Sequence, residues 1–178
     1  MKTEISERSV QHGLERPNTG RLQTLWVEVP GYCNLACSYC YACGGEKLDV
    51  ERLLKWEQYL EILNQAKTLG VNSVGIPGAG EPFNKPNCKL ALRLINLCAD
   101  LGMFVTIFTT GQFITTSLAD ELYNLPVELM IKGNTLKPEL QDKFVSDPIR
   151  GRIITGYGEE RNKAIDRLMV RGFNNRRE

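Results

Sequence analysis

Residues 24–43 read TLWVEVPGYCNLACSYCYAC, an apolar stretch that runs directly into four cysteines. The apolar and β-branched residues at 25–29 predict a β-strand. Cys33, Cys37 and Cys40 follow with the spacing C-x3-C-x2-C, and Cys43 comes just after them. Cysteines so close in sequence are poor disulfide partners, because a disulfide needs a restricted separation of the two Cα atoms. The segment therefore predicts a metal-binding loop at the end of a strand.

Extended and helical patterns alternate along the rest of the chain. Apolar extended stretches predict three further strands, at 73–76, 104–108 and 127–131. Amphipathic patterns predict helices at 50–69, 87–101, 116–124 and 138–145, and a last one around 164–169 that stops at Gly172. Strand followed by helix, repeated four times, predicts an α/β domain with a parallel sheet. Right-handed crossovers would place the cysteine loop at the edge where all the strands end.

Length, composition and charge limit the classes of protein to which this chain can belong. The chain has 178 residues, a length that suits one domain. Its formal net charge of +1 gives no overall positive electrostatic field that would attract nucleic acid or an anionic membrane. It contains no apolar run as long as a membrane helix and no apolar core of a signal peptide near its start. Residues 1–23 are polar and predict a loose lead-in, with His12 solvated, to one domain over 24–178. Clustered thiols without disulfide partners indicate a cytoplasmic protein.

Three thiolates on one short loop suit two kinds of metal site. They can hold a [4Fe–4S] cluster with one iron left open, or zinc with a fourth ligand from elsewhere. Cys43 could also close a four-thiolate site, either ferredoxin-like or zinc. Cys88 and Cys98 lie ten residues apart on one predicted helix, about 15 Å along its axis, so they cannot share a metal there and are expected in the core.

The sequence CNLACSYC at 33–40 resembles the cluster-binding loop of the radical S-adenosylmethionine (radical SAM) superfamily, including the aromatic Tyr39 before the third cysteine. A second match follows the predicted strand at 73–76. There, residues 78–82 read GAGEP and resemble the GGEP element of that family, with Ala79 in place of the first glycine. The resemblance covers residues 25–173 and implies a partial (β/α) barrel, of which only about four βα units are recognisable.

The resemblance also implies which residues bind cofactors. Cys33, Cys37 and Cys40 would ligate a [4Fe–4S] cluster, and the backbone at Ala79 and Gly80 would bind the amino group of S-adenosylmethionine (SAM). Further expected SAM-lining residues are Tyr39, Glu81, Thr110 and Asn134. Thr110 belongs to a glycine-containing loop after the third strand. Asn134 belongs to a run over 132–142 that is similar to the K-x-N-S-x-x-P-E-x-Q-D run of some peptide-modifying members.

Several assignments stay open at this point. Glu81 could be an acid or base, but fixing the turn beside the ligand is the preferred interpretation. Tyr39 and Tyr41 could border adenine or simply pack the loop, and Tyr39 is the better candidate for a ligand contact. The basic residues at the C-terminus are interpreted as a solvated helix face, and residues 151–160 are not assigned to the SAM site.

The implied activity is reductive cleavage of SAM to a 5′-deoxyadenosyl radical, which abstracts hydrogen from an unidentified substrate, with a peptide as one candidate. A one-electron reductant, flavodoxin-like or ferredoxin-like, would be a partner. Relatives have six βα units, so the chain could be a truncated product, one part of a split enzyme with a completing subunit, or a minimal enzyme. The rival interpretations are a non-catalytic four-cysteine iron–sulfur or zinc module, and a SAM-binding subunit that needs a partner chain.

Overall fold

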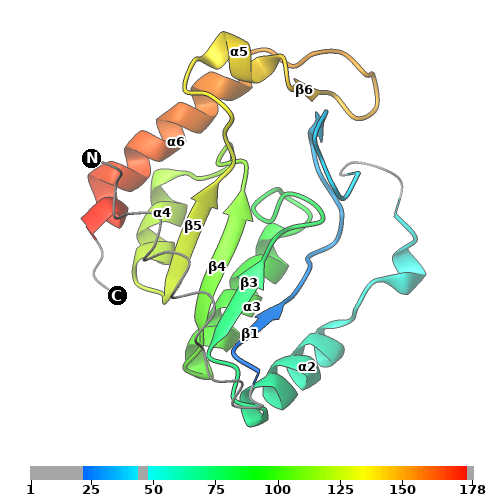
Figure 1. The fold of residues 1–178 in the computed structure, drawn as a ribbon, viewed down its shortest axis with the longest axis vertical. Helices are drawn as coiled ribbons and strands as arrows, with labels where there is room; N and C mark the ends of the chain where they lie inside the picture. Colours follow the sequence, from blue (N-terminus) through cyan, green and yellow to red (C-terminus); the bar gives the residue numbers. More distant parts are fainter. Residues whose placement is uncertain (1–21, 44–47, 176–178) are drawn as a thin grey trace, which may run out of the picture.

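A computed structural model describes residues 22–43 and 48–175 (Figure 1). Its centre is a four-stranded sheet in the order β1-β3-β4-β5, and every neighbouring pair is parallel. The strands are β1 (Thr24–Trp26), β3 (Ser73–Ile76), β4 (Phe104–Thr109) and β5 (Val127–Ile131). The predicted strand at 25–29 leaves the sheet early, although the Val27 amide still donates to the Gly75 carbonyl at 2.9 Å.

A helix follows each of these strands, and α3 and α4 lie behind the sheet in Figure 1. The helices are α2 (Trp56–Thr68), α3 (Cys88–Asp100), α4 (Thr116–Tyr123) and α6 (Tyr157–Arg171). This confirms the predicted α/β class with four βα units. The strands place alternate apolar side chains against these helices, so that Val105 and Ile107 of β4 are fully buried. Cys98 lies in the same core and Cys88 packs against it, as predicted.

The predicted helix at 50–69 is wrong over its first turns. Asp49 caps only a short 3-10 turn, η1 (Val50–Arg52), through its carboxylate and the Glu51 amide. The chain then becomes extended at Leu53, and α2 starts afresh after Lys55, whose amide donates to Gln58. Because the apolar period of the two pieces continues across the break, the sequence pattern did not show it.

The predicted helix at 138–145 is also too long. Helix α5 (Pro138–Asp142) opens at the proline as expected, but Val145 belongs to a short strand, β6 (Val145–Ser146). This strand pairs antiparallel with β2 (Ala36–Cys37), which lies inside the cysteine loop. Tertiary pairing therefore overrides the local helical pattern.

Helix α6 begins earlier than its apolar residues indicated. It starts after Gly156, and the Asp142 carboxylate accepts hydrogen bonds from the Gly156 and Gly158 amides at 2.6 and 2.7 Å. Its predicted end at Gly172 is confirmed, because this glycine adopts a φ of 102° at the C-cap. A final 3-10 turn, η2 (Phe173–Asn175), packs beside it.

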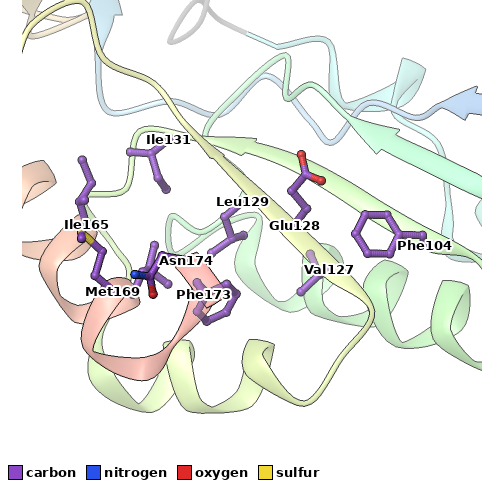
Figure 2. Close-up of a pocket in the computed structure, with 10 residues that line it drawn as sticks. Phe104, Val127, Glu128, Leu129, Ile131, Ile165, Met169, Phe173 and Asn174 are labelled. Atoms are coloured by element: carbon purple, nitrogen blue, oxygen red, sulfur yellow. The ribbon is translucent and has the colours of Figure 1, made fainter. Parts of the chain in front are cut away.

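Strand β5 forms one edge of the sheet, and an apolar groove of about 420 Å³ lies between it and α6 (Figure 2). The groove is lined by Phe104, Val127, Glu128, Leu129, Ile131, Ile165, Leu168, Met169, Phe173 and Asn174. Within the described residues, no helix has both the length and the apolar character needed to cross a membrane. The predicted lead-in at 1–23, with His12, falls almost entirely outside the described residues.

Candidate functional site: the cysteine loop and the GAGEP turn

The three predicted cysteine ligands share one cavity of about 170 Å³ at the carboxyl ends of the strands. The cavity brings together the cysteine loop, the GAGEP turn and the ends of β4 and β5. Its lining residues are Cys33, Leu35, Cys37, Tyr39, Cys40, Tyr41, Pro77, Gly78, Ala79, Gly80, Glu81, Phe108, Thr109, Thr110 and Lys132. Of the residues assigned to cofactors from the sequence, only Asn134 is missing from this lining.

The cysteine loop is held around Cys37 by hydrogen bonds within the loop and by hydrogen bonds from β6. Within the loop, the Cys40 amide donates to the Cys37 carbonyl at 3.0 Å. From outside it, the pairing with β6 places Cys37 opposite Val145, and the Ser146 hydroxyl donates to the Ala36 carbonyl at 3.1 Å. The strand that anchors the loop therefore comes from a segment more than 100 positions later in the chain.

Burial suppresses ionisation of the Cys33 and Cys37 thiols. It raises the pKa of Cys33 to about 11, and nearby Glu81, Cys37 and Cys40 add to this effect. Burial also raises the pKa of Cys37, although Lys132 opposes the rise. Thiols in such surroundings are protonated near neutral pH, and a bound metal group would compensate the charge of their thiolate forms.

The number of thiols in the cavity bears on which metal group they fit. In the described part of the chain, no three His, Cys, Asp or Glu side chains are gathered closely enough to hold a single metal ion. A [4Fe–4S] cluster with one open iron takes three thiolates, and the three half-buried thiols that line this cavity supply that number.

Cys43 lies apart from the other three cysteines. Its side chain is exposed, it is not among the residues that line the cavity, and its backbone has a φ of 48°. This position gives no support to a fourth thiolate in the cavity.

The GAGEP turn depends on close backbone approach at Gly80. A Cβ atom on Gly80 would lie 2.3 Å from the Tyr32 carbonyl oxygen and 2.6 Å from that of Pro30. The next amide, of Glu81, donates to the same Tyr32 carbonyl at 3.0 Å. Glycine is therefore required here for the turn to lie against the segment that enters the cysteine loop.

Glu81 holds the turn to the end of β4. It is 2% exposed, and its carboxylate accepts hydrogen bonds from the Thr109 hydroxyl at 2.5 Å, the Thr110 amide at 2.7 Å and the Phe83 amide at 3.1 Å. Burial raises the pKa of this carboxyl, while the hydrogen bonds from Thr109 and Thr110 oppose the rise. With both oxygens occupied, Glu81 fits the structural role preferred from the sequence rather than that of an acid or base.

Two buried asparagines complete this junction, and sequence reasoning missed them. The Asn84 side-chain amide donates to the Tyr32 carbonyl at 2.7 Å. The Asn87 side-chain amide donates to the carbonyls of Pro30 and Glu81 at 2.9 and 3.1 Å. The only signal in the sequence is the N-x-x-N spacing at the start of a helix, which ordinarily indicates capping.

Glu28 and Tyr41 link the turn to the loop on the other side of the cavity. The Glu28 carboxylate accepts from the Ala79 amide at 2.5 Å and from the Tyr41 hydroxyl at 2.8 Å. Burial and the hydrogen bond to Glu28 raise the pKa of Tyr41 to about 12, so its hydroxyl remains a donor. The Tyr39 ring lies 4.6 Å from the Lys132 Nζ, where the cation faces the π-system.

Asn134 is exposed and is not among the residues that line the cavity. Its backbone amide donates to the Gln141 side-chain oxygen at 2.8 Å, and the buried Arg161 donates to the Thr135 carbonyl at 2.5 Å. Gln141 and Arg161 thus fix the loop after β5, which presents Lys132 to the cavity. The prediction that the basic C-terminal residues form a solvated helix face is wrong for Arg161, whose side chain is 1% exposed. Gln141 lies in the run over 132–142 that is similar to some peptide-modifying members, but no role was predicted for it.

A sequence model described as the Radical SAM superfamily matches residues 27–176. The chain belongs to the radical SAM superfamily. This family match covers the cysteine loop, the GAGEP turn and the ends of β3, β4 and β5, and it confirms the resemblance seen in the two motifs.

Individual radical SAM relatives agree with this membership. The PqqA peptide cyclase of Streptomyces rochei is 31% identical over 140 residues, which are 79% of this chain and 35% of that protein. Among solved structures, SuiB of Streptococcus suis bound to the precursor peptide SuiA superposes with a TM-score of 0.66 at 24% identity, over 85% of this chain and 31% of SuiB. Native anSMEcpe with bound AdoMet gives a TM-score of 0.63 at 16% identity, over 84% and 41% of the two chains.

The structural likenesses confirm the fold as that of a radical SAM core. The chain spans about a third of the length of the first relatives it matches. Its sheet corresponds to the predicted partial barrel of four βα units.

Proposed function

We propose that this chain binds a [4Fe–4S] cluster through Cys33, Cys37 and Cys40 and binds SAM in the adjoining cavity. The observation that carries the proposal is that the three thiols and the GAGEP turn line the same cavity at the carboxyl ends of the parallel strands. When bound, the cluster would supply the electron that cleaves SAM reductively and produces a radical able to take hydrogen from a substrate.

The chain's own residues would hold and orient SAM. The backbone of Gly78, Ala79 and Gly80 lines the cavity without bulky side chains, so a ligand can approach it closely. Tyr39 and Thr110 also line the cavity and are suited to the adenosine part. Lys132 contributes the one cationic group of this lining and is suited to the SAM carboxylate.

Other residues would keep these groups in place and exclude water. Leu35, Pro77 and Phe108 give the cavity apolar walls. Glu81 fixes the turn to β4, and Glu28 ties the turn to Tyr41. Asn134, which is exposed outside the cavity lining, would reach SAM only if the loop after β5 moved.

The proposed substrate class is supported by the names of relatives rather than by a pocket of this chain. The names of PqqA peptide cyclase and of SuiB with its precursor peptide point to peptides. We therefore propose a peptide substrate. We also propose a one-electron carrier as reductant and, because β5 is an edge of the sheet, further βα units supplied beside it.

The test is anaerobic reconstitution of the 178-residue chain with iron and sulfide. We expect about four irons per chain, an EPR signal that changes when SAM is added to the reduced protein, and formation of 5′-deoxyadenosine. A change in the EPR signal without 5′-deoxyadenosine would indicate a SAM-binding subunit that needs a partner. An unchanged signal and no 5′-deoxyadenosine would overturn the proposal.

Two matched variants test the ligand set. Cys37→Ala is expected to abolish the cluster, because it removes a thiol of the cavity. Cys43→Ala is expected to retain both iron and sulfide, because its thiol is exposed outside the cavity. Loss of the cluster in Cys43→Ala would instead support the closed four-thiolate module.

A further inference from the structure

The segment after α5 forms a hairpin against the cysteine loop. Ser146 of β6 pairs with Ile153 on the returning strand, and Asp147 organises the turn between them. The Asp147 carboxylate accepts hydrogen bonds from the amides of Ile149 and Arg150 at 2.8 and 2.7 Å. Figure 1 shows this hairpin projecting next to β2, at the end of the molecule where the sheet strands terminate.

Exposed apolar side chains gather along this hairpin. Ile149 at its tip is 91% exposed, Ile153 is 62% exposed and Phe144 at its base is 39% exposed. These three side chains lie within ten positions of one another, next to three exposed basic residues, Lys143, Arg150 and Arg152. We call the six residues the hairpin surface. Apolar residues surrounded by charged ones are typical of a protein-binding surface.

The hairpin keeps a net positive charge, because residues 143–153 carry three basic side chains against one acidic side chain, Asp147, which faces Arg150. None of its three basic side chains makes an ion pair with another described residue. Asp142 is occupied as the cap of α6, and Glu159 and Glu160 pair with Lys163. Because the whole chain carries only +1, this patch is a local feature and is complementary to an acidic partner.

The hairpin surface contacts the cysteine loop from outside the cavity. The Phe144 ring packs on the Tyr39 ring with centroids 6.1 Å apart, and the Phe144 carbonyl accepts a hydrogen bond from the Ser38 amide at 3.0 Å. Ile149 lies four residues beyond Val145, which is opposite Cys37, so the tip is within about 13 Å of that position. None of the six residues lines the cavity.

We propose that the hairpin surface docks a small acidic protein that delivers one electron to the group held by the three cysteines. A molecule on this surface would contact the cysteine loop without entering the cavity. Contact with the loop is enough for electron transfer, whereas hydrogen abstraction would require the molecule to enter the cavity. This distinction favours the reductant over a peptide substrate. With a flavin donor, an anionic hydroquinone becomes a neutral semiquinone, the cluster gains one electron, and no atom is transferred. The proposal rests on the proposed function.

Binding of oxidised flavodoxin, an acidic carrier, tests the surface without any turnover. We expect calorimetry to show binding at about 20 mM salt and much weaker binding at about 300 mM salt. The double variant R150E/R152E should weaken binding at least about tenfold, and Ile149→Ser should weaken it less. The matched control K67E/K89E reverses two exposed charges on α2 and α3 and should leave binding unchanged. No binding by the wild type, or equal binding by R150E/R152E, overturns the proposal.

Reduction rates separate this proposal from the function on which it rests. Bleaching of the reconstituted cluster by dithionite should be the same in wild type and R150E/R152E, whereas bleaching by flavodoxin hydroquinone should slow at least about tenfold in the variant. A cluster that dithionite reduces, but whose EPR signal does not change with SAM and which yields no 5′-deoxyadenosine, contradicts the proposed function alone. The docking proposal alone is contradicted if flavodoxin hydroquinone reduces wild type and R150E/R152E at equal rates. It is also contradicted if the variant loses the dithionite rate and the flavodoxin rate to the same extent.

Discussion

Gly80 is the residue at which the GAGEP turn and the entry to the cysteine loop come closest. The carbonyl groups of Pro30 and Tyr32 occupy the space that a side chain would need. These carbonyls are themselves fixed by Asn84 and Asn87, so they cannot easily move aside. A single methyl group at this position would therefore disturb both motifs together.

We expect Gly80→Ala to destabilise the protein by about 1–3 kcal/mol, because the new Cβ collides with backbone rather than with a flexible side chain. Urea unfolding measures the change. The matched control is Ala79→Gly, at a position that already carries a Cβ, which should change stability by less than about 1 kcal/mol. Equal effects of the two substitutions would contradict the role of close approach at Gly80.

Cys33 gives a prediction about pH, because burial raises its pKa to about 11 from 9.0. Only the thiolate reacts with iodoacetamide, so the folded apo-protein at pH 8 should be labelled at Cys33 about 100-fold more slowly than an unperturbed thiol. The rate should rise about tenfold per pH unit up to about pH 11. Peptide mapping by mass spectrometry measures it, and urea-unfolded protein is the control. A plateau below pH 9 would contradict the raised pKa.

Among single residues, the positions of the cysteines and of the GAGEP turn could be predicted from sequence, because each motif is defined by residue types at a short local spacing. Asn87 and Arg161 could not. Each donates to backbone carbonyls of a distant segment, and a carbonyl leaves no trace in the sequence. The position of Asn134 outside the cavity lining was missed for a similar reason, because its loop is oriented by Gln141 and Arg161.

Residues 138–171, which contain α5, β6 and α6, hold the cysteine loop in place, and we call this segment the clamp. Helix α5 ends in Asp142, which caps α6, and β6 lies between these helices and pairs with β2. The clamp could not be predicted from the apolar pattern, which favours a helix through Val145. In contrast, β3, β4 and α3 were predicted closely, because their apolar periods and their ends are set within each element.

We expect Asp142→Ala to cost about 1–2 kcal/mol, because it removes the acceptor of both the Gly156 and the Gly158 amides at the start of α6. It should also increase hydrogen exchange at Ser38, whose amide bonds to the clamp at Phe144. The matched control is Asp166→Ala, which removes an exposed carboxylate later on α6. Unchanged exchange at Ser38 would show that the cap and the loop are not coupled.

For the molecule as a whole, the free edge of β5 is the largest incomplete feature. The Val105 amide donates to the Pro126 carbonyl and the Lys132 amide to the Thr109 carbonyl, so the even-numbered residues of β5 bond to β4. Leu129 therefore directs its N–H and C=O to the opposite side, where the described residues provide no neighbouring strand. An apolar groove beside such an edge favours association.

The groove should bind the fluorescent probe ANS, and the protein should self-associate as its concentration rises. Met169→Lys is expected to lower both, since Met169 lines the groove and is 52% exposed. Its neighbour Val170 is 90% exposed on the same helix but does not line the groove, so Val170→Lys is the matched control. ANS fluorescence and sedimentation velocity measure the two effects. Equal reductions by both variants would assign the association to another surface.

The pairing of β2 with β6 also determines when the site can assemble. The Ser146 hydroxyl and the Ala36 carbonyl are 110 positions apart, and the segment between them contains most of the sheet. During synthesis, the cysteines leave the ribosome long before the strand that anchors them. The cysteine loop thus gains its pairing with β6 only after that strand has been made, so a group bound by its three thiols would be taken up late in synthesis or after it.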